Sequence, residues 1–364
     1  MSAGLEFAPL APPEWLSPGE RVWVFGTGSF GRAVARACMA HGVSVQGFVQ
    51  TQPTQVDVEG TPVRSWRELS AADRSMPLLV GIFNRDTPLD GLVHLAHEAG
   101  CQRTVLPWQL HAQFAQDLGW RYWLAATDFL LAHAADLSRV HARLADDASR
   151  DCLRRLVSFR MGTDLEYASF THQVPQYFNE LTLPRFGCRA LKYLDGGAYD
   201  GDSLRQLAGM ALGGVAEAWL FEPDAANYTK LTKAVAAMGL SGTCVPLALS
   251  DSYQLLRFSS GLGEAGHLND DGDHSIAAVA IDEFLAGQAV DFIKLDVEGG
   301  EADALRGAHR TLISHRPVLA ISCYHKPEDL WALPDLIDSL VPDYRFYLRQ
   351  HAFSSFDLVL YAIP

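Results

Sequence analysis

Two hydrophobic segments of this chain end in glycine-rich turns that lead directly into amphipathic helices, and this repeated pattern restricts the fold more than any other feature. The first segment is RVWVFGTGSFGRAVARACMAHG (21–42), and the second is KYLDGGAYDGDSLRQL (192–207). A buried strand that runs through a glycine turn into a helix is typical of the ligand-binding edge of a parallel sheet. The sequence therefore predicts an α/β protein with two doubly wound, Rossmann-like sheets.

A segment of different character separates the two halves. After about residue 110, helical spacing of apolar residues replaces the alternation of strands and helices, and the alternation resumes near residue 191. The last two apolar stretches, YRFYLRQ and FDLVLYAI, predict an antiparallel pair that closes the second sheet. We expect an irregular lead-in at 1–20, a Rossmann-like domain at 21–110, a helical connector at 111–190 and a second α/β domain at 191–364.

Four aromatic residues stand out in the predicted connector. Trp120, Tyr122, Trp123 and Phe129 fall among its helical segments. Large aromatic side chains are most often buried in a core or an interface. We expect these to pack in that way, and they could supply a homodimer interface.

Charge and cysteine usage narrow the classes of function. The chain has 29 Lys and Arg against 43 Asp and Glu, a formal net charge of -14, which disfavours binding to nucleic acid. Its six cysteines form no CxxC pair, which argues against a zinc site and fits a reducing cytosol. No apolar stretch approaches the roughly 20 residues of a membrane helix, and the N-terminus does not resemble a signal peptide. We expect a cytoplasmic protein that binds no membrane.

Three segments of the second half resemble the FkbM family of S-adenosylmethionine (SAM) dependent methyltransferases. They are YLDGGAYDGDS, FEPDAANYTKL with LALSD, and DFIKLDVEGGEADALRGA. The resemblance covers about residues 190–364 and implies a class I methyltransferase fold with SAM as the methyl donor. It also suggests O-methylation of a hydroxyl on a sugar or a sugar-containing small molecule.

The residues at the predicted strand ends suit the parts of SAM. Asp195 would accept a hydrogen bond from the methionine ammonium, and the glycines after it let the backbone approach the ligand closely. Glu222 would take the two ribose hydroxyls. LALSD is predicted as the third strand of this sheet, so Asp251 at its end would lie near the adenine or serve only a turn. Asp224 or Asn227 would cap a helix. The predicted SAM-binding residues are Asp195, Gly196, Gly197, Tyr199, Gly201, Glu222, Pro223, Ser250, Asp251 and Asp296.

Three further ionisable residues are the candidate catalytic residues. Asp296 ends the strand DFIKLD, Glu298 lies in the turn beyond it, and His325 ends the strand PVLAISCYH. A neighbouring carboxylate raises the basicity of a histidine, so His325 assisted by Asp296 is predicted to act as the general base. Glu301, at the start of the next helix, is expected to serve as a cap. We expect no metal, although a divalent cation held by Asp296, Glu298 and His325 stays an open alternative.

The first glycine turn leaves other functions open. Gly26, Gly28 and Gly31 form a Rossmann-type turn, but Gln50 stands where a NAD site places an acid. This half is similar to nucleotide-sugar or CoA-binding modules, and a ligand-free interaction domain is the alternative. Two rival functions therefore remain, an NAD(P)-dependent oxidoreductase that uses this turn and a non-catalytic nucleotide-binding scaffold.

Overall fold

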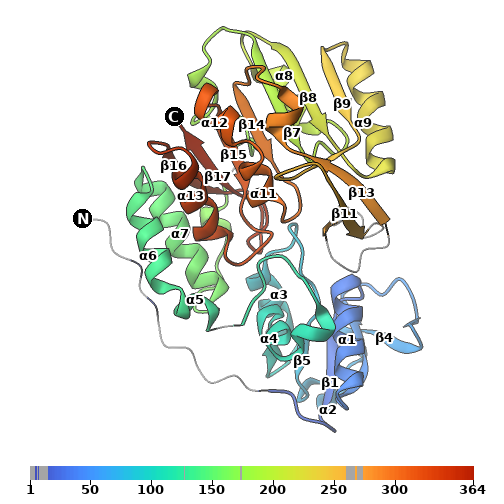
Figure 1. The fold of residues 1–364 in the computed structure, drawn as a ribbon. Helices are drawn as coiled ribbons and strands as arrows, with labels where there is room; N and C mark the ends of the chain where they lie inside the picture. Colours follow the sequence, from blue (N-terminus) through green and yellow to red (C-terminus); the bar gives the residue numbers. More distant parts are fainter. Residues whose placement is uncertain are drawn as a thin grey trace.

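The computed structural model describes residues 5 and 7 and the ranges 15–126, 128–172, 174–259, 267–268 and 274–364. Two large sheets, one in each half of the chain, lie apart from each other with helices around them (Figure 1). Most of their strand pairs are parallel, so the predicted α/β class is confirmed. In the described part of the chain, no helix combines the length and the apolar character needed to cross a membrane.

The first sheet has the strand order β3-β4-β2-β1-β5-β6. All its neighbouring strands are parallel except β3 and β4. The central strands β1 and β5 are buried, which explains their continuous apolar sequences VWVF and LLV. The strands are β1 (Arg21–Phe25), β2 (Ser44–Gln50), β3 (Asp57–Val58), β4 (Thr61–Ser65), β5 (Leu78–Val80) and β6 (Thr104–Val105).

The helices of the connector pack mainly on the second half of the chain. Helix α7 contacts strand β16, and α6 contacts α13, as Figure 1 shows at the lower left of the larger sheet. Helix α4, by contrast, packs on α1 of the first half. The helices up to this point are α1 (Ser29–Ala40), α2 (Ala71–Arg74), α3 (Leu89–Glu98), α4 (Pro107–Leu118), α5 (Phe129–Ala132), α6 (Ala134–Arg143) and α7 (Asp147–Arg160), with 3-10 turns at Trp66–Glu68, Ala168–Phe170 and Leu183–Arg185.

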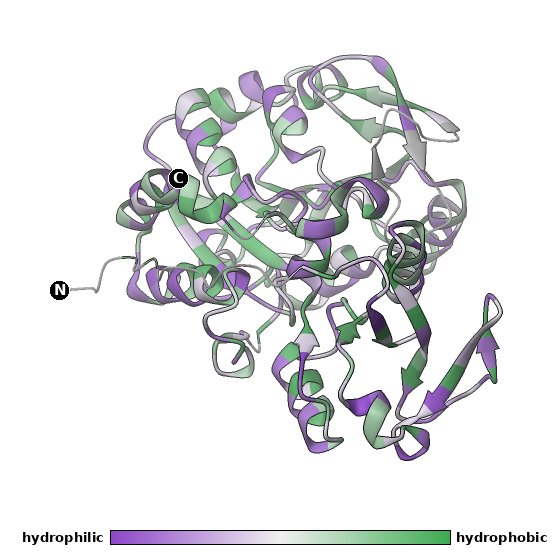
Figure 2. Ribbon diagram, turned by 90° about the horizontal axis from the view of Figure 1, so that it is seen from below, coloured by the Kyte–Doolittle hydropathy of each residue, from purple (hydrophilic) through white to green (hydrophobic). Residues whose placement is uncertain are grey.

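The second sheet has the strand order β16-β17-β15-β14-β7-β8-β9. Strand β17 runs antiparallel to both its neighbours, which confirms the predicted antiparallel closing pair. Figure 2 shows largely hydrophobic strands beside helices of mixed hydropathy, the pattern expected for a sheet covered on both faces. The strands are β7 (Leu191–Gly196), β8 (Val215–Phe221), β9 (Gly242–Val245), β14 (Phe292–Leu295), β15 (Val318–Ser322), β16 (Arg345–Gln350) and β17 (Leu358–Ile363).

The helices of the second half follow the strands in the predicted order. Helices α8 and α9 follow β7 and β8, and α11 follows β14. Each of these links therefore returns the chain to the start of the next parallel strand. The helices are α8 (Asp202–Met210), α9 (Ala225–Met238), α10 (Ile281–Leu285), α11 (Glu301–Arg306), α12 (His309–His315) and α13 (Asp329–Leu340).

A smaller sheet was not foreseen from the sequence. Strands β10 (Ala248–Leu249), β11 (Gln254–Ser259), β12 (His267–Leu268) and β13 (His274–Val279) form it in the order β10-β13-β11-β12. We predicted LALSD at the third strand of the main sheet, and this is wrong, because β9 takes that place. Pro246 lies between β9 and β10 and cannot donate a ladder hydrogen bond. The sequence predicts a polar, glycine-rich loop at 260–273, and most of this segment lies outside the described residues.

The first half of the chain and the connector both form hydrogen bonds with the loop between β16 and β17. The backbone N–H of Phe353 donates to the carbonyl of Arg85 in the first half, at 3.0 Å. In the connector, Trp123 donates its indole N–H to the carbonyl of Ser354 at 2.8 Å, and Arg160 donates to the hydroxyl of Ser355 at 2.9 Å. The two halves are therefore in direct contact beside this loop.

Candidate active site

Four of the predicted site residues lie at one edge of the second sheet. Strands β15, β14, β7 and β8 are neighbours, and their carboxyl ends carry His325, Asp296, Asp195 and Glu222. This is the edge at which open parallel sheets bind their ligands. The structure therefore brings together the residues predicted for SAM and those predicted for catalysis.

Asp195 is fully buried against a lysine that we did not single out from the sequence. The Nζ atom of Lys294 lies 2.8 Å from Oδ1 of Asp195 and donates to the carbonyl of Gly197 at 2.6 Å. Burial lowers the pKa of Lys294, but Asp195 and Asp296 outweigh this and raise it, so the ammonium is charged. Burial raises the pKa of Asp195 to about 6, and Lys294 limits the rise. A lysine within the buried strand FIKL was the signal for this pair.

The glycine turn after β7 touches the turn after β14. Gly197 has φ +76°, and a Cβ atom there would lie 2.0 Å from the carbonyl oxygen of Asp296. Only glycine fits this position. Gly201, at φ +83°, then forms the left-handed N-cap of α8. The close contact fixes Asp195 and Asp296 relative to each other.

Glu222 is almost fully buried and accepts two backbone hydrogen bonds. Its Oε2 atom accepts from the N–H of Tyr199 at 3.0 Å, and Oε1 accepts from the N–H of Asp224 at 2.9 Å. Burial raises its pKa to about 7, although the two backbone donors oppose the rise. The carboxylate thus ties the glycine turn to the end of β8, and each oxygen keeps a lone pair for a ligand.

Asp224 and Ser250 form hydrogen bonds to residues of their own loops. Asp224 accepts from the N–H groups of Ala226 and Asn227, both at 2.9 Å, which confirms it as the cap of α9. Pro223 precedes it and is half-buried. The hydroxyl of Ser250 accepts from the amide of Gln254 at 2.7 Å.

Asp251 is exposed and bonded within its own turn. It accepts from the hydroxyl of Ser252 at 2.8 Å and from the amide of Gln254 at 3.2 Å. A turn role is therefore visible in the structure, and contact with adenine stays a prediction.

His325 is fully buried among three carboxylates. Its Nδ1 atom lies 2.8 Å from Oε1 of Glu301, and its Nε2 atom lies 3.4 Å from Oδ1 of Asp296 and 3.5 Å from Oε2 of Glu298. Burial lowers the pKa of His325, but the carboxylates, Glu301 foremost, raise it to about 10. The imidazole is therefore protonated at neutral pH, whereas a general base requires the neutral form.

Asp296 and Glu298, the two carboxylates near Nε2 of His325, have pKa values that are shifted in opposite directions. Asp296 accepts hydroxyl hydrogen bonds from Tyr177 at 2.9 Å and Tyr324 at 3.4 Å. Burial raises its pKa, but Lys294 and His325 more than offset this and hold it below the usual value. Burial raises the pKa of Glu298 to about 8. Glu298 also has φ +53°, in the left-handed region that residues other than glycine rarely adopt. Such strained backbone conformations are more frequent at functional sites.

Glu301 does not cap its helix, so that prediction is wrong. Gly300 is the N-cap of α11 and makes no side-chain cap. The buried Glu301 carboxylate instead accepts from the N–H of Val297 at 2.9 Å and bonds His325. The spacing of DVEGGE could not reveal this, because His325 arrives from the neighbouring strand.

The connector places aromatic rings beside His325. The indole N–H of Trp120 donates to the carbonyl of His325 at 3.0 Å. The ring of Tyr122 lies 6.2 Å from the rings of both Tyr324 and His325. The predicted packing role is confirmed for Trp123, which is buried, and for Tyr122 and Phe129, which are half-buried and pack against the core; Trp120 is half-buried.

The first half of the chain also reaches this edge. Arg85 lies in the loop after β5, and its Nη1 atom is 3.4 Å from Oδ1 of Asp357. Its charge lowers the pKa of Glu298, which opposes the effect of burial.

At the first glycine turn, a Cβ atom on Gly31 would lie 2.3 Å from the carbonyl oxygen of Gly26. The amide of Gln50 donates to the hydroxyl of Thr27 in the same turn, at 2.8 Å. Binding of a nucleotide at the turn of Gly26, Gly28 and Gly31 stays a prediction.

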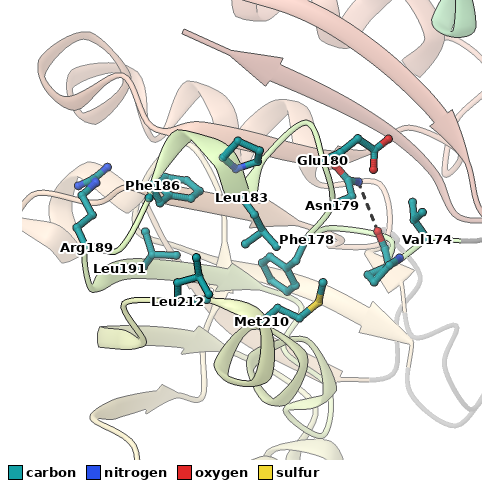
Figure 3. Close-up of a pocket in the computed structure, with 14 residues that line it drawn as sticks. Val174, Phe178, Asn179, Glu180, Leu183, Phe186, Arg189, Leu191, Met210 and Leu212 are labelled. Atoms are coloured by element: carbon teal, nitrogen blue, oxygen red, sulfur yellow. Dashed lines mark hydrogen bonds between the residues drawn. The ribbon is translucent and has the colours of Figure 1, made fainter.

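A mostly apolar pocket of about 450 Å³ lies at the opposite end of β7. Figure 3 shows Phe178, Phe186 and Leu191 around it, with Glu180 and Arg189 on different sides. None of the predicted site residues lines this pocket, so it is separate from the candidate active site.

The fold and this edge define a methyltransferase-like α/β protein. A solved structure titled methyltransferase FkbM from Methylobacillus flagellatus KT is similar, with a TM-score of 0.75, 24% identity and coverage of 95% of this chain and 90% of that chain. Residues 195–355 match the family model described as methyltransferase FkbM domain. The C-terminal half therefore carries an FkbM methyltransferase domain, and the resemblance inferred from the sequence is confirmed there.

Other solved structures cover about half of the chain. A putative rRNA-methylase from Clostridium thermocellum has 12% identity and a TM-score of 0.32, over 50% of this chain and 92% of that chain. A SAM dependent methyltransferase from Aquifex aeolicus has 16% identity and a TM-score of 0.31, over 51% and 89%. No curated protein matches the chain.

Proposed function

We propose that the protein transfers a methyl group from SAM to a hydroxyl of a sugar or a sugar-containing small molecule. The observation that carries this proposal is the convergence of Asp195, Glu222, Asp296 and His325 at the carboxyl ends of four neighbouring strands in an FkbM methyltransferase domain. The dispersed cysteines support the expectation that the reaction takes place in the cytoplasm.

The arrangement supports SAM as the methyl donor. Glu222 is buried at the end of β8 and keeps lone pairs for the two ribose hydroxyls. Asp195 lies one strand away, beside a glycine turn at which backbone N–H groups can meet the methionine carboxylate. Lys294 keeps the Asp195 carboxylate ionised, and a ligand ammonium would share that charge.

The acceptor would lie between the connector and the end of β15. Tyr122 and Trp120 border His325 there, and aromatic rings offer a sugar an apolar face together with polar groups at the edge. This supports a saccharide acceptor, which we inferred first from the family resemblance.

Methyl transfer then needs alignment and the movement of one proton. The hydroxyl oxygen attacks the methyl carbon, and the electron pair of the breaking carbon–sulfur bond goes to sulfur. The hydroxyl proton passes to a carboxylate of the group formed by His325, Asp296 and Glu298, in which Asp296 Oδ1 and Glu298 Oε2 lie 3.4 Å and 3.5 Å from Nε2 of His325.

Calorimetric titration of the full chain with SAM and S-adenosylhomocysteine tests the proposal. We expect both to bind with one site per chain. Titration with NADH, followed by quenching of the fluorescence of the eight tryptophans, is the matched test of the oxidoreductase alternative. Tight NADH binding without SAM binding would favour that alternative, and binding of none of the three would favour the scaffold.

A further inference from the structure

Among the described residues, three buried polar atoms of the cluster around His325 make no hydrogen bond. They are Nε2 of His325, Oε2 of Glu298 and Oε2 of Glu301. His325 and Glu301 are at most 1% exposed, so bulk water does not satisfy them. Buried polar atoms without partners are rare, and several in one cluster indicate a bound ion or ordered water.

The spacing of the cluster suits one metal ion. Asp296, Glu301 and His325 each offer a ligand atom, and these atoms lie within 4.8 Å of one another. A divalent metal binds nitrogen and oxygen ligands at about 2.0–2.2 Å, which puts opposite ligands roughly 4.2 Å apart. Glu298, with Oε2 at 3.5 Å from Nε2 of His325, is close enough to join by a small rotation.

The cluster contains more carboxyl groups than cationic side chains. Three carboxylates surround a single imidazole, and a fourth, Asp329, is also buried nearby. Lys294 and Arg85 are adjacent cations, but Lys294 already pairs with Asp195 and two backbone carbonyls, and Arg85 pairs with Asp357. Buried carboxylates without a matching positive charge are unfavourable unless they bind protons or a cation.

We propose that His325, Asp296 and Glu301 bind a divalent first-row transition-metal ion, with Glu298 as an additional ligand. The ion displaces the Nε2 proton of His325 when it binds. Glu301 then has a double role: Oε1 bonds Nδ1 of His325 and so directs Nε2 toward the ion, while Oε2 makes no hydrogen bond and coordinates the ion. A mixed imidazole and carboxylate set suits manganese, iron or cobalt better than magnesium. This differs from our expectation of a metal-free site.

The ion would activate the acceptor, a role that rests on the proposed function. A hydroxyl oxygen bound to a divalent cation loses its proton more readily, and the alkoxide is the nucleophile for the SAM methyl carbon. The proton passes to a carboxylate of the cluster. The binding itself does not depend on that role and can be measured alone.

Manganese is the probe for the test. The full chain is treated with EDTA, freed of chelator and titrated with Mn²⁺ while electron paramagnetic resonance measures the free ion. We expect one site per chain and modulation from an imidazole nitrogen in the spin-echo signal. Asp296→Asn, which keeps the side-chain shape, should weaken binding at least tenfold, and His325→Gln should remove the nitrogen signal. The control Asp303→Asn alters an exposed acid on the same α11 and should bind as wild type does.

The outcomes separate this inference from the proposed function. Absence of a manganese site, or unchanged binding by folded Asp296→Asn and His325→Gln proteins, would overturn the metal proposal even if SAM binds. Manganese binding without SAM binding would leave the metal site standing and refute the proposed methyl donor. Circular dichroism and the melting temperature establish that each variant is folded.

Discussion

Lys294 and Asp195 form an ion pair at 2.8 Å in which both side chains are at most 3% exposed. The pair joins neighbouring strands β14 and β7 directly beneath the glycine turn. It therefore links the stability of the sheet to the geometry of the proposed SAM site.

Removing only the lysine should destabilise the protein strongly. Lys294→Met keeps the length of the side chain but leaves Asp195 buried without its partner, which typically costs about 3–5 kcal/mol. The double variant Lys294→Met with Asp195→Asn should recover part of this loss. Denaturant unfolding measures both. The control Lys233→Met, on the exposed face of α9, should change stability by less than about 0.5 kcal/mol. Equal stability of Lys294→Met and the control would refute the assigned pair.

Truncation of Glu222 should weaken SAM binding without unfolding the chain. Glu222→Ala removes the acceptor of the ribose hydroxyls, a loss of about 1.5–3 kcal/mol for hydrogen bonds to a charged group. The dissociation constant should rise roughly tenfold to a hundredfold. Calorimetry with the variant checks this. An unchanged constant would place the SAM site elsewhere.

The same residue should make stability depend on pH. Burial raises the pKa of Glu222 from 4.5 to about 7, so the native state holds this proton more tightly than the unfolded state does. Stability from this group is therefore present at low pH and falls as pH rises from about 4.5 to 7, by roughly 3 kcal/mol at most. Glu222→Gln should be free of this loss. Its stability relative to wild type, measured by denaturant unfolding, should increase from pH 5 to pH 8. A constant difference would contradict the buried carboxylate.

Loss of the imidazole should affect turnover rather than SAM binding. His325→Ala should lower kcat by about 100-fold or more, because the imidazole pairs with the carboxylates that take up the hydroxyl proton, and leave the SAM dissociation constant nearly unchanged. His309→Ala, which alters an exposed histidine on α12, is the matched control. Near wild-type turnover of His325→Ala on the true acceptor would exclude His325 from the reaction.

The strand ends could be predicted because their signals are local. Asp195, Glu222, Asp296 and His325 each follow a short apolar run, and the carboxyl ends of parallel strands must share an edge. The glycine turn after Asp195 could also be predicted from local sequence, because closely packed turns need glycine.

The partners across the sheet could not be predicted in this way. The bond from Glu301 to His325 joins residues 24 apart in sequence, and the contact of Trp120 with His325 spans 205 residues. Both depend on strand order and domain packing, on which local spacing carries no information. The place of Ala248–Leu249 was missed because a short apolar run suits either sheet, and only Pro246 marks the change.

A crystal structure of the full chain with S-adenosylhomocysteine tests the central claim most directly. We predict the ribose hydroxyls within hydrogen-bonding distance of Glu222, the methionine amino group beside Asp195, and the sulfur facing His325 and Asp296. A ligand bound instead at the Gly26–Gly31 turn, or an empty second-sheet edge at saturating ligand, would contradict the account.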